Sequence, residues 1–225
     1  MCGRFTITLE PTFFQQELDL GKVPSEWTPR YNVAPSQNIP VVRNPDTRNV
    51  EMLRWGLIPF WAKDKSIGYR MINARSETIQ EKPSFRNAFK QRRCLILADG
   101  FYEWQKPATK GTGTSKAPFR YTLMGNQPFT FAGLWETWRD ENEKEIQSCA
   151  IITCPPNELI KKVHNRMPVI LDKNECWKWL ENESLDSLQG MLKPYEARKM
   201  IGYSVSQLVN NPRLDSQEVI KPLAF

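Results

Sequence analysis

The 225-residue chain has few of the residues that build metal sites and disulfide frameworks. It contains a single histidine, and its five cysteines are an odd number with no C-x-x-C pair. Zinc sites and small disulfide-stapled folds need such clusters, so the composition argues against both. The phosphate-binding patterns G-x-x-x-x-G-K-[ST] and G-x-G-x-x-G do not occur either. We therefore expect no metal and no organic cofactor.

Long hydrophobic runs are also lacking. No apolar stretch is long enough to span a bilayer, and the first residues, broken early by Arg4 and Glu10, do not resemble a secretory signal. We therefore expect a cytoplasmic protein with no membrane partner.

Apolar and aromatic residues are plentiful, which excludes global disorder. Hydrophobic residues make up 40% of the chain and aromatic residues 11%, including eight tryptophans, which is ample for a core. The formal net charge of +6 is compatible with a polyanionic partner. Aromatic side chains beside arginines are also what a groove for single-stranded nucleic acid requires.

Short strand-like runs, bounded by Pro, Gly or Asn, alternate irregularly with helical patches. The irregular order lacks βαβ repeats and predicts an α+β fold with a mainly antiparallel sheet. The stretch Lys106–Lys116 is expected to be a surface loop within the domain. The expected strands are Ile39–Val42, Val50–Ile58, Cys94–Ala98, Phe119–Leu123, Phe129–Leu134, Cys149–Thr153 and Pro168–Leu171. The expected helices are Thr12–Leu20, Ser84–Gln91 with Ser84 as its cap, Pro156–Val163, Cys176–Leu180 after a capping pair at Asp172 and Glu175, and one that Ser184 caps and that ends before Pro194.

The second residue is the most informative in the chain. The initiator methionine is normally removed before a small residue, so the mature protein is expected to begin at Cys2. A terminal cysteine carries an α-amine with a reference pKa of about 7.7–8.0 and a thiol with one of about 8.5, both partly deprotonated near neutrality. Such a pair can attack an acyl carbon or condense with an aldehyde to a thiazolidine. The alternative is a frayed terminus, but the alternation of Phe5, Ile7 and Leu9 favours an anchored first strand.

Two further residues have the chemistry of proton transfer. His164, the lone histidine, stands between an expected helix and an apolar strand, where a side chain can reach the edge of a sheet. Glu103 is bracketed by Phe101, Tyr102 and Trp104, surroundings that can raise the pKa of a carboxyl group. The alternatives are a structural histidine satisfied by a backbone carbonyl and an exposed glutamate on an alternating strand.

Three segments are candidates for nucleic-acid contact. In an extended strand, Asn73 and Arg75 share one face, so an amide and a guanidinium can face one cleft. Trp55 is better explained by core packing, whereas Trp61, near two lysines, is the better candidate for stacking on a base. Arg86 belongs to a basic helix, although such charge runs are usually only a solvated face.

Six motifs, taken together, resemble one family. They are MCGRF at the start, RYNVAPSQ at 30–37, LRWGLIPFW at 53–61, MINARSET at 71–78, LADGFYEW at 97–104 and HNRMPVIL at 164–171. In this order they look like the SOS-response-associated peptidase family, whose members are also described as abasic-site processing proteins. The similarity extends through VSQLVNN at 205–211.

The resemblance implies one domain over residues 1–225, without Met1 in the mature protein, with a β-barrel-like core and a positively charged DNA cleft. It implies an enzyme whose partner is single-stranded DNA with abasic sites, to which Cys2 bonds covalently, and a nucleoid association during DNA damage if the source is bacterial. Matching motifs give Cys2, Asn73, Glu103 and His164 as active-site residues and Arg4, Trp61, Arg75 and Arg86 as DNA contacts.

The residues and the resemblance suggest the same reaction. The Cys2 amine would attack the open-chain aldehyde of an abasic sugar, and the thiol would close a thiazolidine that shields the lesion. An imine that is not closed could promote strand cleavage, which is lyase chemistry, and Met1 removal could be autoproteolytic. The alternatives are an N-terminal-nucleophile amidohydrolase similar to glutamine amidotransferases and a module that binds single strands without a covalent bond.

Overall fold

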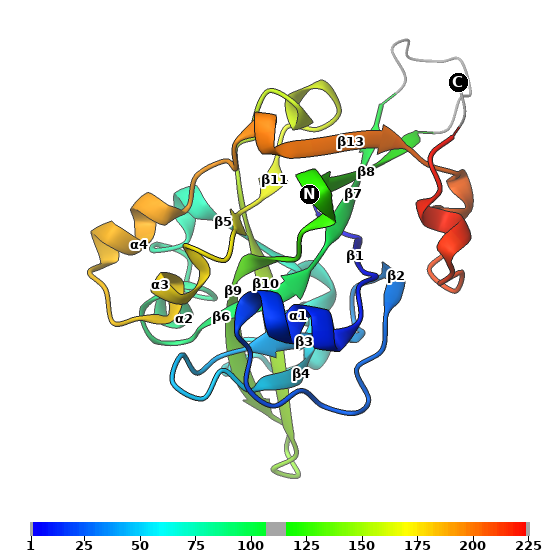
Figure 1. Cartoon of the computed structure of the whole chain (residues 1–225). Helices are drawn as coiled ribbons and strands as arrows, with labels where there is room; N and C mark the ends of the chain where they lie inside the picture. The colour runs from blue at the N-terminus through cyan, green and yellow to red at the C-terminus, as the bar shows by residue number, and fades with distance from the viewer. Residues whose placement is uncertain (1, 107–115, 224–225) are drawn as a thin grey trace.

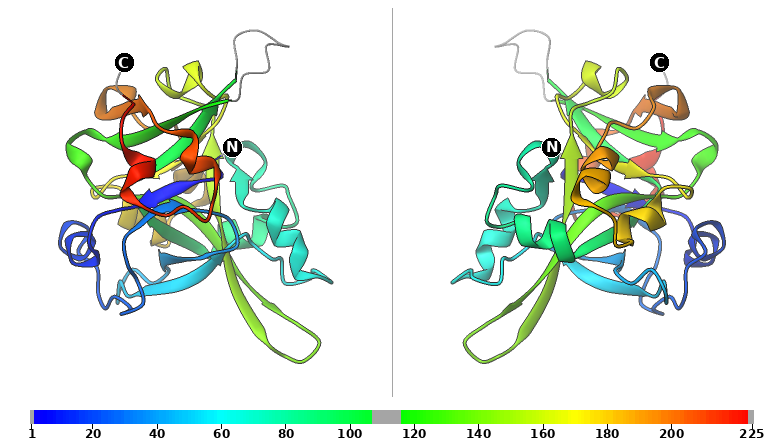
Figure 2. Two further views of the ribbon diagram at one scale, coloured as in Figure 1. Left: turned by 90° about the vertical axis from the view of Figure 1, so that its right-hand side faces the viewer. Right: turned by 90° about the vertical axis from the view of Figure 1, so that its left-hand side faces the viewer.

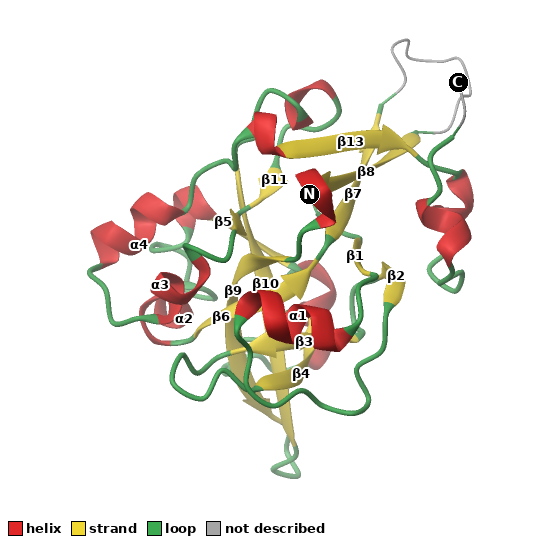
Figure 3. Ribbon diagram, in the orientation of Figure 1, coloured by secondary structure: helices red, strands yellow, loops and turns green. Residues whose placement is uncertain are grey.

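A computed structural model of the chain describes residues 2–106 and 116–223. It contains two β-sheets with helices at their periphery (Figures 1 and 3). The first sheet has five antiparallel strands, in the order β13 (Met200–Ser204), β8 (Ala117–Leu123), β7 (Gly100–Gln105), β1 (Phe5–Ile7) and β2 (Arg30–Val33). Within the described part of the chain, no helix is both long enough and apolar enough to cross a membrane.

The second sheet closes on itself as a five-stranded barrel. Its ring runs β3 (Asn38–Val42), β4 (Val50–Trp55), β10 (Glu145–Cys154), β9 (Phe129–Arg139), β6 (Arg93–Ala98) and back to β3. Three short strands extend it: β5 (Asn73–Arg75) and β11 (Met167–Pro168) pair with β10, and β12 (Ile170–Leu171) pairs with β9. The pairings of β10 with β4 and with β5 are parallel, and the others are antiparallel. Beyond the barrel, β9 and β10 continue as a protruding hairpin (Figure 2).

The helices are short and lie outside the barrel. Of the four α-helices among the described residues, three gather on one side of the barrel in Figure 1, and α1 lies apart from them. The α-helices are α1 (Pro11–Leu18), α2 (Arg86–Gln91), α3 (Cys176–Leu180) and α4 (Leu185–Met191). Short 3-10 segments are η1 (Lys65–Arg70), η2 (Ser76–Thr78), η3 (Met124–Asn126), η4 (Ile160–Lys162), η5 (Ala197–Lys199), η6 (Gln207–Asn210) and η7 (Gln217–Ile220).

The first strand is anchored by aromatic packing at the barrel. Phe5 is fully buried, and its ring makes edge-on contacts with Trp55, 5.1 Å between centroids, and with Phe131, 5.6 Å. Edge-to-face pairs of this kind stabilise beyond the area that they bury. The expected anchored start is therefore confirmed, and Cys2, three residues before the strand, is itself part of the core.

The expected fold class is confirmed: the chain is α+β, with a mainly antiparallel barrel core and peripheral helices. The expected strands occur with shifted ends, except that Pro168–Leu171 divides into β11 and β12. The helix expected over Pro156–Val163 is wrong, because only the turn η4 forms there. The side chain of Asn157 accepts the backbone N–H groups of Leu159 and Ile160, a local bond that competes with a helix.

The hydrogen bonds at the starts of α2, α4 and α3 test the capping residues that the sequence predicts. Helix α2 begins at Arg86, and Ser84 does not cap it. The Ser184 side chain does accept the N–H of Ser187, so the expected cap of α4 is confirmed. Before α3, Asp172 accepts the N–H of Asn174, whereas Glu175 makes no side-chain cap bond. Residues 107–115 of the expected loop Lys106–Lys116 lie outside the described residues.

Candidate active site at the N-terminal cysteine

Cys2 lies three residues before Phe5, the first residue of β1, and is completely buried. Its carbonyl oxygen accepts a hydrogen bond of 2.8 Å from Nδ2 of Asn73. Asn73 is the first residue of β5, which lies parallel to β10 with Asn73 opposite Ile151. The barrel strand β10 thus fixes β5, and β5 fixes the backbone of Cys2. The other amide atom, Oδ1 of Asn73, is buried and has no hydrogen-bond partner among the described residues.

Glu103 lies on β7, next to β1, and only 2% of it is exposed. Alternation along β7 places it on the same face as Phe101, a core residue. Burial raises the pKa of its carboxyl group from 4.5 to about 7. Burial, reinforced by the charge of Glu103, also raises the pKa of the Cys2 thiol well above its ordinary value. The thiol is therefore protonated at neutral pH and needs a base before it can attack.

His164 faces Glu103 with a defined ring nitrogen. Its Nε2 lies 3.9 Å from Oε2 of Glu103, while its Nδ1 accepts the backbone N–H of Arg166 at 3.1 Å. Nδ1 also lies 3.3 Å from the carbonyl oxygen of Arg166, so the contacts of Nδ1 fit either neutral tautomer. Burial lowers the pKa of His164, and the charges of Lys106 and Lys116 act in the same direction. At neutral pH the site thus combines a neutral imidazole with a carboxyl group near its midpoint.

An arginine that the sequence reasoning did not select stands behind the histidine. Arg166 makes a two-point ion pair with Glu77, with 2.9 Å between Nη2 and Oε2, and Nη2 also donates to the carbonyl of Thr153 at 2.5 Å. The pair joins the loop that carries His164 to the segment that follows Asn73 in β5. The signal that could have found it is its place inside the HNRMP motif.

The four expected DNA contacts have different surroundings. Arg75, at the end of β5, and Arg86, at the start of α2, are exposed. Arg4 is half-buried, and its Nη1 donates to Oδ1 of Asn32 and to the carbonyl of Val209, both at 2.7 Å. Part of its guanidinium is therefore already used inside the fold. Of the four residues, Arg4 has the least freedom to contact a phosphate.

The fourth, Trp61, is exposed, as are two other aromatic side chains close to it in the sequence. It is 48% exposed, its neighbour Phe60 58%, and Tyr69 in η1 61%, with the guanidinium of Arg54 5.5 Å from the Tyr69 ring centre. Trp55, by contrast, is fully buried, which confirms its assignment to the core. The sequence reasoning missed Phe60 and Tyr69, although both are aromatic residues close to Trp61 in the sequence.

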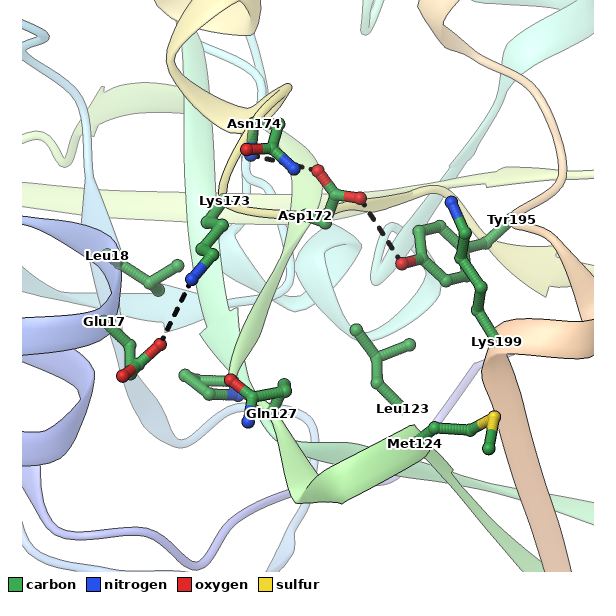
Figure 4. A pocket seen from close by; sticks show the side chains of 11 residues that line it. Glu17, Leu18, Leu123, Met124, Gln127, Asp172, Lys173, Asn174, Tyr195 and Lys199 are labelled. Atoms are coloured by element: carbon green, nitrogen blue, oxygen red, sulfur yellow. Dashed lines mark hydrogen bonds and ion pairs between the residues drawn. The ribbon is translucent and has the colours of Figure 1, made fainter.

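A pocket of about 250 Å³ lies elsewhere on the surface, between α1, η3 and the turn before α3 (Figure 4). Its charged groups largely satisfy one another, since Lys173 lies 3.5 Å from Glu17 and the Tyr195 hydroxyl 3.4 Å from Asp172. None of Cys2, Asn73, Glu103 and His164 lines it, so it is separate from the cysteine site.

The model of the SOS response associated peptidase (SRAP) family matches residues 1–212. The chain belongs to this family. The resemblance seen in the six motifs is thereby confirmed, and it covers every residue of the cysteine site.

Relatives in the SRAP family carry informative names. The chain is 48% identical over 227 residues to abasic site processing protein YoqW of Bacillus subtilis, covering 98% of this chain and 99% of the relative. It is 30% identical over 247 residues to abasic site processing protein HMCES of Pongo abelii, covering 93% of this chain and 69% of the relative. A crystal structure of a Bacteroides thetaiotaomicron protein has the same fold, with a TM-score of 0.87, 26% identity and coverage of 99% of this chain and 100% of that one.

Proposed function

We propose that this SRAP protein recognises abasic sites in single-stranded DNA and bonds to them covalently through Cys2. The observation that carries the proposal is the grouping at the start of β1. There, Asn73 donates a hydrogen bond to the Cys2 carbonyl. The charge of Glu103 helps to raise the pKa of the Cys2 thiol, and its carboxylate faces His164. The names of the bacterial and vertebrate relatives support the choice of substrate.

The reaction begins when loss of Met1 gives Cys2 a free α-amine. That amine adds to the aldehyde of the open abasic sugar and expels water, which leaves an imine. The thiol then adds across the C=N bond: sulfur bonds to carbon, its proton passes to nitrogen, and a five-membered thiazolidine closes. No oxidant, reductant or cofactor is needed, because every atom comes from the protein or the sugar. Residues 1–225 would act as one domain in this scheme, without Met1 in the mature form.

Glu103 and His164 would move the protons of this sequence. A carboxyl group with a pKa of about 7 can protonate the sugar ring oxygen as the ring opens and can also accept the proton of the Cys2 thiol. His164 faces that carboxylate through Nε2, and the tautomer with its proton on Nε2 would stabilise the charged form of Glu103. Asn73 would orient Cys2 through the bond to its carbonyl.

The exposed residues among the expected DNA contacts would bind the strand on both sides of the lesion. Arg75 follows Asn73 by two positions and would contact a phosphate, and Arg86 would contribute a second charge. Trp61, with its exposed aromatic neighbours, would stack on or wedge against bases. Arg4 would contribute only through the part of its guanidinium that Asn32 and Val209 leave unused.

Two side activities belong to the same chemistry. An imine that the thiol fails to close can lose the 3′ strand by β-elimination, which is lyase activity. Met1 can be removed by the Cys2 thiol itself, with Glu103 and His164 assisting, which is self-directed peptidase activity. The lyase step would take place wherever the protein meets damaged DNA, in the cytoplasm and at the nucleoid of a bacterium, whereas Met1 removal would come before it.

Two other functions predict different products. An N-terminal-nucleophile amidohydrolase would release ammonia from glutamine, and no amino-acid clamp supports that reaction here. A non-covalent binder would coat single strands reversibly and leave no product that survives denaturation. Mass spectrometry after incubation with abasic DNA, together with an assay for ammonia released from glutamine, separates all three.

The decisive experiment combines a denaturing gel with matched substrates. Mature protein should form a heat-stable adduct with an abasic oligonucleotide and none with its tetrahydrofuran analogue, which cannot open to an aldehyde. Cys2→Ala should form no stable adduct, whereas Cys2→Ser, which keeps the amine, should give a labile imine and more strand cleavage. Cys176→Ala, which removes a distant thiol, should behave like the wild type. A stable adduct with Cys2→Ala would exclude the thiazolidine.

A further inference from the structure

A second cavity, of about 470 Å³, lies on the opposite face of the first sheet from Glu103. Tyr102 pairs with Arg120 across β7 and β8, and Glu103 pairs with Phe119, so Arg120 and Glu103 point to opposite faces. The C-terminal segment lines the other side with Gln217, Ile220, Lys221 and Pro222. The turn η7 in this segment packs against β2, and Figure 2 shows the course of the C-terminal segment in red. The polar lining of the cavity includes Thr8, Tyr31, Arg120, Tyr203, Gln217 and Lys221.

The side chains that line the cavity include positively charged groups and hydrogen-bond donors but no carboxylate. None of the nine described residues that line the cavity is Asp or Glu, whereas Arg120 and Lys221 both carry positive charge. Lys221 lies 2.6 Å from Glu218 at the exposed rim, so its charge is partly offset. The charge at the base of the cavity therefore comes from Arg120.

Arg120 is a buried guanidinium, with only 5% of the residue exposed. Its Nη2 lies 3.4 Å from Oδ1 of Asp99 and 3.1 Å from Oγ1 of Thr6. Asp99 also accepts hydrogen bonds from Thr6, Thr8 and Leu9. Asp99 therefore offsets part of the Arg120 charge, while Nη1 of the guanidinium is directed to Tyr203 in the lining.

Two tyrosine hydroxyls in the lining are left with hydrogens to donate. Nη1 of Arg120 donates to the Tyr203 oxygen at 2.7 Å, and Nε2 of Gln217 donates to the Tyr31 oxygen at 3.2 Å. In both bonds the partner nitrogen can only donate, so each tyrosine is the acceptor. Among the described residues, neither hydroxyl hydrogen has an acceptor. A ligand rich in acceptor oxygens would satisfy both.

We propose that this cavity binds a phosphate monoester of a nucleotide. The phosphate oxygens would accept from Tyr31 and Tyr203 beside the Arg120 charge, which favours a dianion over a neutral ligand. The tyrosine rings, Ile220 and Pro222 supply apolar surface for a nucleoside, and the volume lies within the range of small-molecule sites. The ligand is either a free nucleotide or the phosphorylated end of a DNA strand, and the site is independent of the chemistry at Cys2.

Isothermal titration of the full chain with inorganic phosphate, thymidine monophosphate and thymidine tests the site. We expect saturable binding of the two phosphates and none of thymidine. Tyr203→Phe and Tyr31→Phe keep the rings and remove one hydroxyl each, so each should weaken phosphate binding by about 5- to 10-fold. Tyr195→Phe, in the other pocket, is the matched control and should bind as the wild type does.

Competition with oligonucleotides separates the two sources. If a 5′-phosphorylated strand displaces thymidine monophosphate and a 5′-hydroxyl strand does not, the ligand is a strand end. If neither strand displaces it, the ligand is a free nucleotide. Equal displacement by both strands, no saturable phosphate binding, or unchanged binding in both tyrosine variants would each overturn the proposal. Adduct formation at Cys2, measured in the same variants, reports separately on the proposed function.

Discussion

The environment of Glu103 makes the free energy of unfolding depend on pH. The folded state raises its pKa from 4.5 to about 7, so the folded protein holds a proton that the unfolded chain has already lost between these values. Stability therefore falls as pH rises from about 4.5 to 7 and then levels off. Glu103→Gln removes the charge and should be more stable than the wild type at pH 8, by an amount of the order of 3 kcal/mol, with little gain at pH 4. Urea unfolding at both pH values measures this, and equal pH slopes for the two proteins would contradict it.

The same residue should set the pH dependence of adduct formation. If protonated Glu103 helps to open the sugar ring, the ratio of the wild-type rate to the Glu103→Gln rate should be greatest below pH 7 and fall as the carboxyl group ionises. The ratio cancels the contribution of the Cys2 amine, which both proteins share. Single-turnover gels from pH 5 to 9 measure it. A ratio that rises through pH 7 would assign Glu103 the role of base instead.

Among the elements, the end of β4 depends on one glycine. Gly56 has φ +123°, and a Cβ at this position would come within 2.6 Å of the Gly68 carbonyl oxygen. Gly56→Ala should therefore destabilise the protein by about 2–4 kcal/mol and displace the segment that carries Trp61. Gly190→Ala, in α4 with open space around it, is the control and should stabilise by about 0.5–1 kcal/mol. Thermal unfolding compares them, and an unaffected Gly56→Ala would contradict the strain argument.

The ion pair between Glu77 and Arg166 holds the His164 loop against the segment after β5. The Glu77 side chain is 45% exposed, so Glu77→Gln should cost less than about 1 kcal/mol of stability. Adduct formation should slow more, by roughly tenfold, because the loop loses an anchor. NMR titration of the single histidine reports on the loop directly. Glu81→Gln, at an exposed position nearby, is the control, and an unchanged histidine titration in Glu77→Gln would remove this positioning role.

The strands were predictable where apolar runs are bounded by turn residues. They were less predictable where tertiary contacts decide the ends of a strand and its pairing partner. Ile39–Val42 lies within β3, with one more residue at its start. The division of Pro168–Leu171 follows from pairing with two different strands, β10 and β9, which local sequence does not encode. The missing helix at Pro156–Val163 follows from the side-chain bonds of Asn157. Asparagine at that position was a readable turn signal that the helical spacing outweighed.

The candidate site was accessible to sequence reasoning only through its motifs. Cys2, Asn73 and Glu103 lie on separate segments, and no spacing rule predicts that β5 would hold the Cys2 carbonyl. The Glu77–Arg166 pair joins residues 89 positions apart, so no local pattern contains it. The involvement of Arg4 in the fold was missed for the same reason, since one of its acceptors is the distant Val209.

For the molecule as a whole, the positive surface should be visible in the salt dependence of DNA binding. If Arg75 contacts one phosphate of a single strand, Arg75→Ala should reduce the slope of log K against log salt by about 0.7. Arg139→Ala removes an equal charge from the distant β9–β10 hairpin, where Glu143 and Glu145 already pair with it, and should leave the slope unchanged. Fluorescence anisotropy over a salt series compares them. Equal slopes for wild type and Arg75→Ala would exclude the contact.

The anchoring of Cys2 has a practical consequence for anyone who purifies this protein. A fused affinity handle ahead of Cys2 would have to leave the barrel beside Phe5 and Asn73, where the chain is enclosed, and would also mask the reactive amine. The other end of the described chain is open, since Leu223 is 49% exposed. Handles for isolation or immobilisation therefore belong at the C-terminal end, where they leave the chemistry of the first residue intact.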